Sequence, residues 1–283
     1  MTPIGPSIGP SIGPSTAALF EAADGATFSA TEHARGPWDP RHCHGGPVAA
    51  LLTRAVEQCE PGDVEWQVAR VTVELTRPVP VGRALTLTAT TERGGKRVSL
   101  VGAVLTDDGV EVARARGLRI RTDVMALPDV VDSTVAPFPL PPERSRLERF
   151  TLSPAGGDDM TSFARDACEH RYASGSFTEP GPVAVWIRLT VPVVPDEAPT
   201  GAQRAAAAAD FGNGVSAVLP WDRFLFINPD LTMHLSRPPH GEWIGLDAFT
   251  HLGPHGAGLA ESALHDAHGP IGRAAQSLYL DHR

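Results

Sequence analysis

Asp210 lies at the end of a predicted helix, where a carboxylate that is only solvated is not expected. It follows five consecutive alanines at the end of a helix predicted from Gln203 to Asp210. A carboxylate is unfavourable in the last turn of a helix, where the macrodipole is negative. An ionised carboxylate accepts hydrogen bonds and can draw a proton from a bound water. We therefore interpret Asp210 as a candidate general base; the alternative is a solvated side chain near Gly212 and Gly214.

His44-Gly45-Gly46 opens another predicted helix. It is followed by Pro47 and the apolar run 48–59, and a proline in the first turn is typical of a helix start. The first N–H groups of a helix have no partner within it and can bind a negatively charged oxygen. The segment is thus a candidate site for stabilising negative charge. The alternative is that the two glycines only turn the chain into the helix.

Gln276 is the third candidate. It lies between Ala275 and Ser277 on the last predicted strand, whose face includes Ala274 and Leu278. An amide that faces a core must find hydrogen-bond partners. A position on a solvated face is the alternative.

Neither a metal centre nor a nucleophilic cysteine is expected. His42, Cys43 and His44 are consecutive, and neighbouring residues rarely bind the same ion; no His-Glu-x-x-His or Cys-x-x-Cys motif is present. No feature of the sequence lowers the pKa of Cys43. The segment Gly5–Gly9 matches the Gly-x-Ser-x-Gly motif of hydrolases, but it lies in a Gly/Pro-rich repeat without the strand and helix that this motif needs. We expect residues 1–16 to be disordered.

The elements around these residues predict an α+β fold. Hydrophobic alternation indicates strands, and Gly94-Gly95 and Asp107-Asp108-Gly109 are typical hairpin turns. Residues 123–149 are rich in proline, as expected of a linker. Helices are predicted at 48–59 and 203–210, and strands at 71–76, 85–90, 170–177, 184–189, 224–236, 243–249, 259–266 and 271–281.

The two halves of the chain repeat each other. Val73 to Pro78 aligns with Met233 to Pro238, an offset of 237 − 77 = 160 between the two Arg-Pro pairs. The turn glycines Gly109 and Gly269 keep this offset. A shared order of helix and meander predicts two related units. At the same offset Gln276 aligns with Arg116. The first helix has Thr53 nine residues past His44, where the second half has Asp210. Because the two halves differ at both positions, we expect one complete site per chain and not two.

Composition excludes several classes of protein. A net charge of −9 argues against a nucleic-acid partner, and no apolar run reaches the roughly 20 residues of a membrane helix. Three cysteines without a paired pattern fit a reducing cytoplasm.

Several motifs together resemble the TesB-like acyl-CoA thioesterases of the thioesterase-like superfamily. The motifs are His44-Gly45-Gly46, Ala209-Asp210, the run 226–232, Arg237-Pro238, Gly241-Glu242-Trp243 and Ala275-Gln276-Ser277. The resemblance implies a double hot-dog, in which two antiparallel sheets join edge to edge and each wraps around a long central helix. The expected units are a tail at 1–16, hot-dogs at 17–122 and 150–283, and a linker at 123–149.

The resemblance also implies a site and a reaction, the hydrolysis of a fatty acyl-CoA to a fatty acid and coenzyme A without a cofactor. Asp210 and Gln276 would orient the attacking water, and the acyl chain would lie in a tunnel beside the helices. The family's Ser or Thr position falls on Asn228, a departure that puts the rate in doubt. His44, Gly45 and Gly46 would bind the oxyanion, and Thr232 offers a hydroxyl about 13 Å along the strand from Asn228.

Two alternatives remain open. Because Asn228 replaces the hydroxyl, the chain could bind acyl-CoA with little or no turnover. The other alternative is an acyl-CoA hydratase of the same fold, a class that usually has an Asp and a His a few residues apart at a helix start; we expect no such Asp-x-x-x-x-His pattern near either helix. For the thioesterase and for both alternatives we expect an acyl-CoA ligand, no metal and a possible homo-oligomer.

Overall fold

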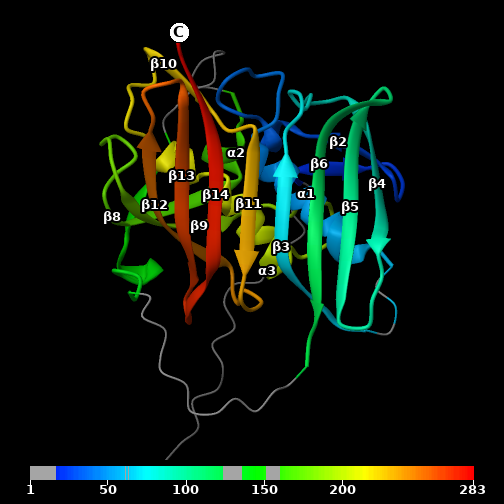
Figure 1. Ribbon diagram of the computed structural model, residues 1–283. Helices are drawn as coiled ribbons and strands as arrows, with labels where there is room; N and C mark the ends of the chain where they lie inside the picture. The colour runs from blue at the N-terminus through cyan, green and yellow to red at the C-terminus, as the bar shows by residue number, and fades with distance from the viewer. Residues whose placement is uncertain (1–16, 61, 63, 124–135, 151–159) are drawn as a thin grey trace, which may run out of the picture.

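The computed structural model describes residues 17–60, 62, 64–123, 136–150 and 160–283. Within these ranges, 14 strands form one continuous sheet in which all pairs are antiparallel. Its order is β1-β2-β4-β5-β6-β3-β11-β14-β13-β12-β9-β8-β7, and β10 also pairs with β14. Figure 1 shows the sheet spanning both halves of the chain, with α1 and α3 behind its centre.

The elements have the following bounds. The strands are β1 Phe20–Ala22, β2 Thr27–Ala30, β3 Trp66–Glu74, β4 Ala84–Arg93, β5 Val98–Asp107, β6 Val110–Arg121, β7 Arg146–Glu148, β8 Cys168–Ser174, β9 Val183–Leu189, β10 Phe224–Ile227, β11 Asp230–Leu235, β12 Trp243–Leu252, β13 Ala257–Asp266 and β14 Gly269–His282. The helices are α1 Gly45–Gln58, α2 Phe163–Asp166, α3 Gly201–Ala209 and α4 Gly212–Val215, with short 3-10 turns at Glu32–Ala34 and Pro142–Arg144.

The two halves meet where β3 pairs with β11. The register sets Thr72 opposite Thr232, and the Thr232 hydroxyl donates to the Thr72 hydroxyl at 3.2 Å. These two threonines are also related by the repeat offset of 160 residues. The seam therefore pairs equivalent residues of the two halves, as a pseudo-twofold axis through these two threonines requires.

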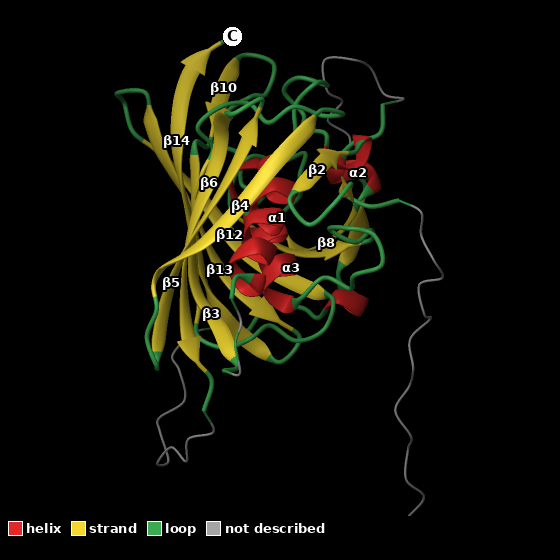
Figure 2. Ribbon diagram, turned by 90° about the vertical axis from the view of Figure 1, so that its right-hand side faces the viewer, coloured by secondary structure: helices red, strands yellow, loops and turns green. Residues whose placement is uncertain are grey.

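Helices α1 and α3 lie against the same face of the sheet and pack on each other (Figure 2). Small side chains permit this close approach: the alanines of α3 are buried, and a Cβ on Gly46 would lie 2.6 Å from the Ala207 carbonyl oxygen. His44 caps the start of α1, and Thr200 caps the start of α3 by accepting from the Gln203 N–H. The N-terminus of α1 thereby lies beside the C-terminal end of α3.

The sequence expectations differ from the structure in two places. The strand predicted over 224–236 is two strands, because Asn228 and Pro229 interrupt it between β10 and β11. Part of the predicted linker is ordered against the second half: Phe138 packs on Trp186 at 4.3 Å, and the Trp186 indole N–H donates to the Leu140 carbonyl at 2.7 Å. The predicted disorder of residues 1–16 lies outside the described residues.

Candidate active site

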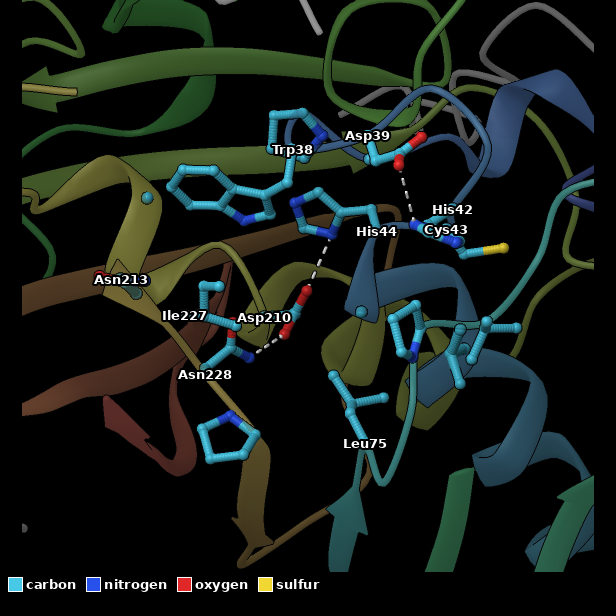
Figure 3. A pocket seen from close by; sticks show the side chains of 18 of the residues that line it. Trp38, Asp39, His42, Cys43, His44, Leu75, Asp210, Asn213, Ile227 and Asn228 are labelled. Carbon is cyan, nitrogen blue, oxygen red and sulfur yellow. Dashed lines mark hydrogen bonds and ion pairs between the residues drawn. The ribbon is translucent and has the colours of Figure 1, made fainter. Parts of the chain in front are cut away.

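Asp210 holds its carboxylate at the junction of the two halves. It is the C-cap residue of α3 and only 6% exposed. Asn228 Nδ2 donates to Asp210 Oδ1 at 2.7 Å, and Gln276 Nε2 donates to the same oxygen at 3.1 Å. His44 Nδ1 lies 2.8 Å from the other oxygen, Oδ2. Figure 3 shows His44 and Asn228 pointing at this carboxylate from opposite sides.

The amide of Gln276 has a defined orientation. The side chain is 1% exposed on β14, and its Oε1 accepts the Asn213 N–H at 3.0 Å. Its Nε2 donates to the Asp210 carbonyl and carboxylate, each at 3.1 Å. Since Oε1 is held by a backbone donor, the NH₂ group must face Asp210. Asn213, whose Nδ2 donates to the Phe226 carbonyl at 2.9 Å, belongs to no motif that sequence reasoning could have found.

His44 connects the helix start to the carboxylate. Its Nδ1 lies 3.1 Å from the Gly46 N–H donor and 2.8 Å from Asp210 Oδ2. The imidazole therefore contacts both the start of α1 and the carboxylate of the candidate base. The imidazole is held between Phe163 and Phe211, at centroid distances of 5.0 and 4.8 Å.

The two glycines serve different contacts. A Cβ on Gly45 would lie 2.7 Å from both carboxylate oxygens of Asp210, so only glycine lets the helix start approach this group. Gly46 lies instead against the backbone of α3. Because His44 accepts the Gly46 N–H, the Gly45 N–H is the donor of the first turn that remains beside the carboxylate.

A cavity of about 340 Å³ opens over these groups. Both halves line it, and Asp210, His44, Gly45 and Asn228 are among its lining residues. Thr232 does not line it, because its hydroxyl is engaged with Thr72 at the seam. Of the residues chosen from the sequence, the structure thus brings Asp210, Gln276, Asn228, His44, Gly45 and Gly46 together and leaves Thr232 apart.

The register corrects one expectation about the repeat. Arg116 pairs with Thr72 and Ala275 pairs with Thr232, so the last strands are offset by one residue less than the rest of the repeat. The structural counterpart of Gln276 is therefore Gly117 and not Arg116. A Cβ on Gly117 would lie 2.2 Å from the Val56 side chain, so no amide fits there.

The pseudo-symmetric position between the α1 C-terminus and the α3 N-terminus is closed. The Thr53 hydroxyl is buried and has no hydrogen-bond partner in the part of the chain that the structure describes. The Glu57 carboxylate accepts from the Thr200 hydroxyl at 2.8 Å and from Gln203 Nε2 at 2.7 Å. Burial raises the pKa of Glu57, although Gln203, Thr200 and the charge of Arg54 oppose the shift.

Glu57→Gln tests this closed position through stability. A carboxyl group whose pKa is raised by folding stabilises the folded state below its ordinary pKa of 4.5, and this contribution is lost as the pH rises through the folded-state pKa. The amide keeps both hydrogen bonds and does not titrate. We expect the free energy of unfolding of Glu57→Gln, relative to wild type, to rise between about pH 5 and about pH 8. Urea unfolding at both pH values measures it, with exposed Glu65→Gln as control; a difference independent of pH would contradict the burial effect.

Asp39 and His44 have the Asp-x-x-x-x-His spacing ahead of α1. The expectation that no such pattern occurs near either helix is therefore wrong, and the sequence pattern alone does not exclude a hydratase. The Asp39 carboxylate is turned to Arg41 at 2.7 Å and lies 3.5 Å from His42 Nδ1. His44 contacts Asp210 instead. The geometry therefore favours the Asp210 pair over an Asp39–His44 pair.

Cys43 also lines the cavity, and burial raises the pKa of its thiol to about 12, which disfavours a thiolate nucleophile. Among the residues that the structure describes, no group of three or more His, Cys, Asp and Glu side chains is arranged to hold a metal ion. No helix in the described part of the chain has the length and apolar character needed to cross a membrane.

Solved structures show that this is the hot-dog fold. A hot-dog-fold protein of Alicyclobacillus acidocaldarius matches with a TM-score of 0.66 and 17% identity, covering 92% of this chain and 95% of its own. A candidate thioesterase of Novosphingobium aromaticivorans matches with a TM-score of 0.65 and 21% identity over 93% and 98%. The TesB protein of Mycobacterium avium subsp. paratuberculosis gives 0.62 and 16% over 93% and 96%. Comparison with curated proteins gives no match.

The sequence itself shows the family. Residues 34–120 match the acyl-CoA thioesterase N-terminal domain, and residues 134–280 match the acyl-CoA thioesterase C-terminal domain. The second match alone spans more than half of the chain. The chain belongs to the acyl-CoA thioesterase family and is a thioesterase, an enzyme that hydrolyses thioesters.

Proposed function

We propose that the protein hydrolyses acyl-CoA with a water molecule that Asp210 activates, in one site per chain formed between two hot-dog halves at 17–122 and 150–283. The observation that carries the proposal is the buried carboxylate of Asp210 at the cavity, with His44, Asn228 and Gln276 all within 3.1 Å. Two of these side chains are neutral amide donors, which leave the carboxylate charge available. A positioned carboxylate beside a water is what general-base hydrolysis requires.

Each remaining residue takes a role that its contacts support. Gln276 and Asn228 hold Asp210 Oδ1 by donated hydrogen bonds, so Oδ2 faces His44 and the attacking water. Asn228 thereby replaces the hydroxyl of the family pattern with an amide donor. The Gly45 N–H, at a helix N-terminus beside the carboxylate, is the group placed to stabilise the oxyanion of the tetrahedral intermediate.

Release of free thiol from acyl-CoA thioesters of different length and shape tests the proposal. Turnover of at least one thioester by the purified chain, lost in Asp210→Asn, is the expected result. Tight binding without thiol release would show the inactive alternative to be correct. A 2-enoyl-CoA in the same series separates the hydratase, which would hydrate the double bond and release no thiol.

Arg77 is the residue we assign to the phosphate end of coenzyme A. It lines the cavity, and within the described residues its guanidinium donates only to the Glu111 carbonyl, at 2.8 Å. Its repeat counterpart Arg237 is instead held by both oxygens of Asp266 at 2.6 Å. At the corrected offset of 159 residues the counterpart of Asp266 is Asp107, whose carboxylate is engaged by Arg83 at 3.1 Å. Among the described residues Arg77 therefore has no ion pair, in a chain of net charge −9.

Arg77→Ala is expected to raise KM for acyl-CoA about tenfold with little change in kcat, because a phosphate contact is equal in the ground and transition states. The same acyl group on N-acetylcysteamine lacks phosphates and should be hydrolysed equally by both enzymes. Arg97→Ala, an exposed arginine in the hairpin at the other end of the sheet, is the matched control. Equal loss with both thioesters would contradict the assignment.

His44→Asn separates the two contacts of His44. Asparagine is a good N-cap and can still accept the Gly46 N–H, but it is too short to contact Asp210. We expect kcat/KM to fall about tenfold, while the melting temperature stays near that of wild type. An unchanged kcat/KM would show that His44 only caps α1.

A further inference from the structure

Aromatic rings form one wall of the cavity. Trp38 and Trp221 both line it, are partly exposed, and pack on each other at a centroid distance of 5.2 Å. Phe226, which is 2% exposed, lies edge-on behind them, at 5.7 Å from Trp38 and 4.4 Å from Trp221. The two indoles therefore present apolar ring surface to the cavity and are supported from behind.

This wall continues toward the carboxylate. Phe150 and Phe211 also line the cavity, with ring centroids 6.1 Å apart. Phe177 connects Phe150 to Trp221, at 4.0 and 6.2 Å. We call Trp38, Phe150, Phe177, Phe211, Trp221 and Phe226 the aromatic wall. Phe177 and Phe226 do not line the cavity and pack on the four members that do. The members of the aromatic wall come from segments far apart in sequence, so it is a product of the tertiary fold.

The wall and Arg77 define the direction of the substrate. In Figure 3, Trp38, Asn213 and Ile227 lie on one side of Asp210, and His42 and Cys43 lie on the other. Arg77 follows Leu75 at the cavity margin, next to Val79, whose carbonyl accepts the Cys43 N–H at 2.8 Å. With the phosphates at Arg77 and the thioester at Asp210, the acyl group points to the aromatic wall.

The space for the acyl group is short. A passage between α1 and α3 is closed, because Gly46 already lies against Ala207 and Phe163. The cavity volume of about 340 Å³ is at the lower end of the roughly 300–1,000 Å³ of ligand pockets. Of the two long helices, only Gly45 and Val48 of α1 and the C-cap residue Asp210 of α3 line the cavity.

From this geometry we infer that the acyl group carries an aromatic ring: the substrates are coenzyme A thioesters of compact aromatic acids, such as phenylacetyl-CoA. The inference rests on the proposed function and names its substrate class. A flat ring can meet the indoles edge-to-face or offset-stacked, which adds to the gain from area alone. It also loses less rotamer freedom on binding than a straight chain with the same number of carbon atoms.

Three thioesters of similar size test the inference by thiol release: phenylacetyl-CoA, cyclohexylacetyl-CoA and octanoyl-CoA, with palmitoyl-CoA as the long-chain comparison. We expect kcat/KM for phenylacetyl-CoA to exceed that for octanoyl-CoA and palmitoyl-CoA at least about tenfold, and that for cyclohexylacetyl-CoA about threefold. Trp221→Leu should reduce the phenylacetyl-to-octanoyl ratio about tenfold. Trp243→Leu is the control, because Trp243 stacks with Arg171 and Arg188 and does not line the cavity.

The outcomes separate this inference from the proposed function. Hydrolysis of octanoyl-CoA or palmitoyl-CoA as fast as phenylacetyl-CoA would overturn the aromatic preference and leave the thioesterase site standing. If no thioester is hydrolysed, the proposed function fails, and binding decides the inference. In that case, titration of tryptophan fluorescence must show tighter binding of phenylacetyl-CoA than of octanoyl-CoA; equal or weaker binding overturns it.

Discussion

Asp210→Asn is expected to lower kcat/KM at least about a hundredfold, because a positioned general base contributes roughly 10²–10⁴ in rate. Asparagine has the shape of aspartate and can turn its oxygen toward the donors on Asn228 and Gln276. The hydrogen bonds from Asn228 and Gln276 are thus retained, but the residue can no longer take a proton from water.

Steady-state thiol release measures the loss, and circular dichroism with thermal unfolding checks that the variant is folded. Asp247→Asn, an exposed aspartate on β12, is the matched control and should retain the wild-type rate. If Asp210→Asn retained more than about a tenth of wild-type kcat/KM, the general-base role of Asp210 would be wrong.

Gly45→Ala is expected to lower kcat/KM about a hundredfold with little loss of stability. The new methyl group would lie 2.7 Å from both Asp210 oxygens, and the carboxylate must turn toward the open cavity to relieve the contact. A displacement of about 1 Å in a catalytic group can reduce the rate about a hundredfold. Since a side chain can move where a backbone cannot, the helix packing is preserved.

The neighbouring glycine gives the matched comparison. A methyl group on Gly46 would meet the Ala207 carbonyl oxygen at 2.6 Å and the Phe163 ring at 2.9 Å. Relief requires α1 and α3 to separate, so Gly46→Ala should lower the free energy of unfolding by about 1–3 kcal/mol, the usual cost of overpacking. Urea unfolding and kcat/KM of both variants separate the two effects. The same loss of rate and stability in both would show that neither glycine has a specific contact.

The candidate residues could be predicted because their signals are local or repeated. Asp210 is conspicuous after five alanines, the hydrophobic alternation around Gln276 indicates a strand, and the two Arg-Pro pairs reveal the repeat. Periodicity and helix-start chemistry depend on neighbours within a few residues, so a single sequence contains them. The family resemblance then connected these residues to thioester hydrolysis.

Other features depend on contacts across the seam of β3 and β11, which joins residues some 160 positions apart. The contact of His44 with Asp210 and the aromatic wall arise only when the two halves dock, since no local pattern sets the distance between their members. The structural counterpart of Gln276 was assigned wrongly from the sequence, as Arg116 in place of Gly117, for the same reason. A shift of one residue reverses which face of the sheet a side chain occupies, and the neighbouring strand sets that register.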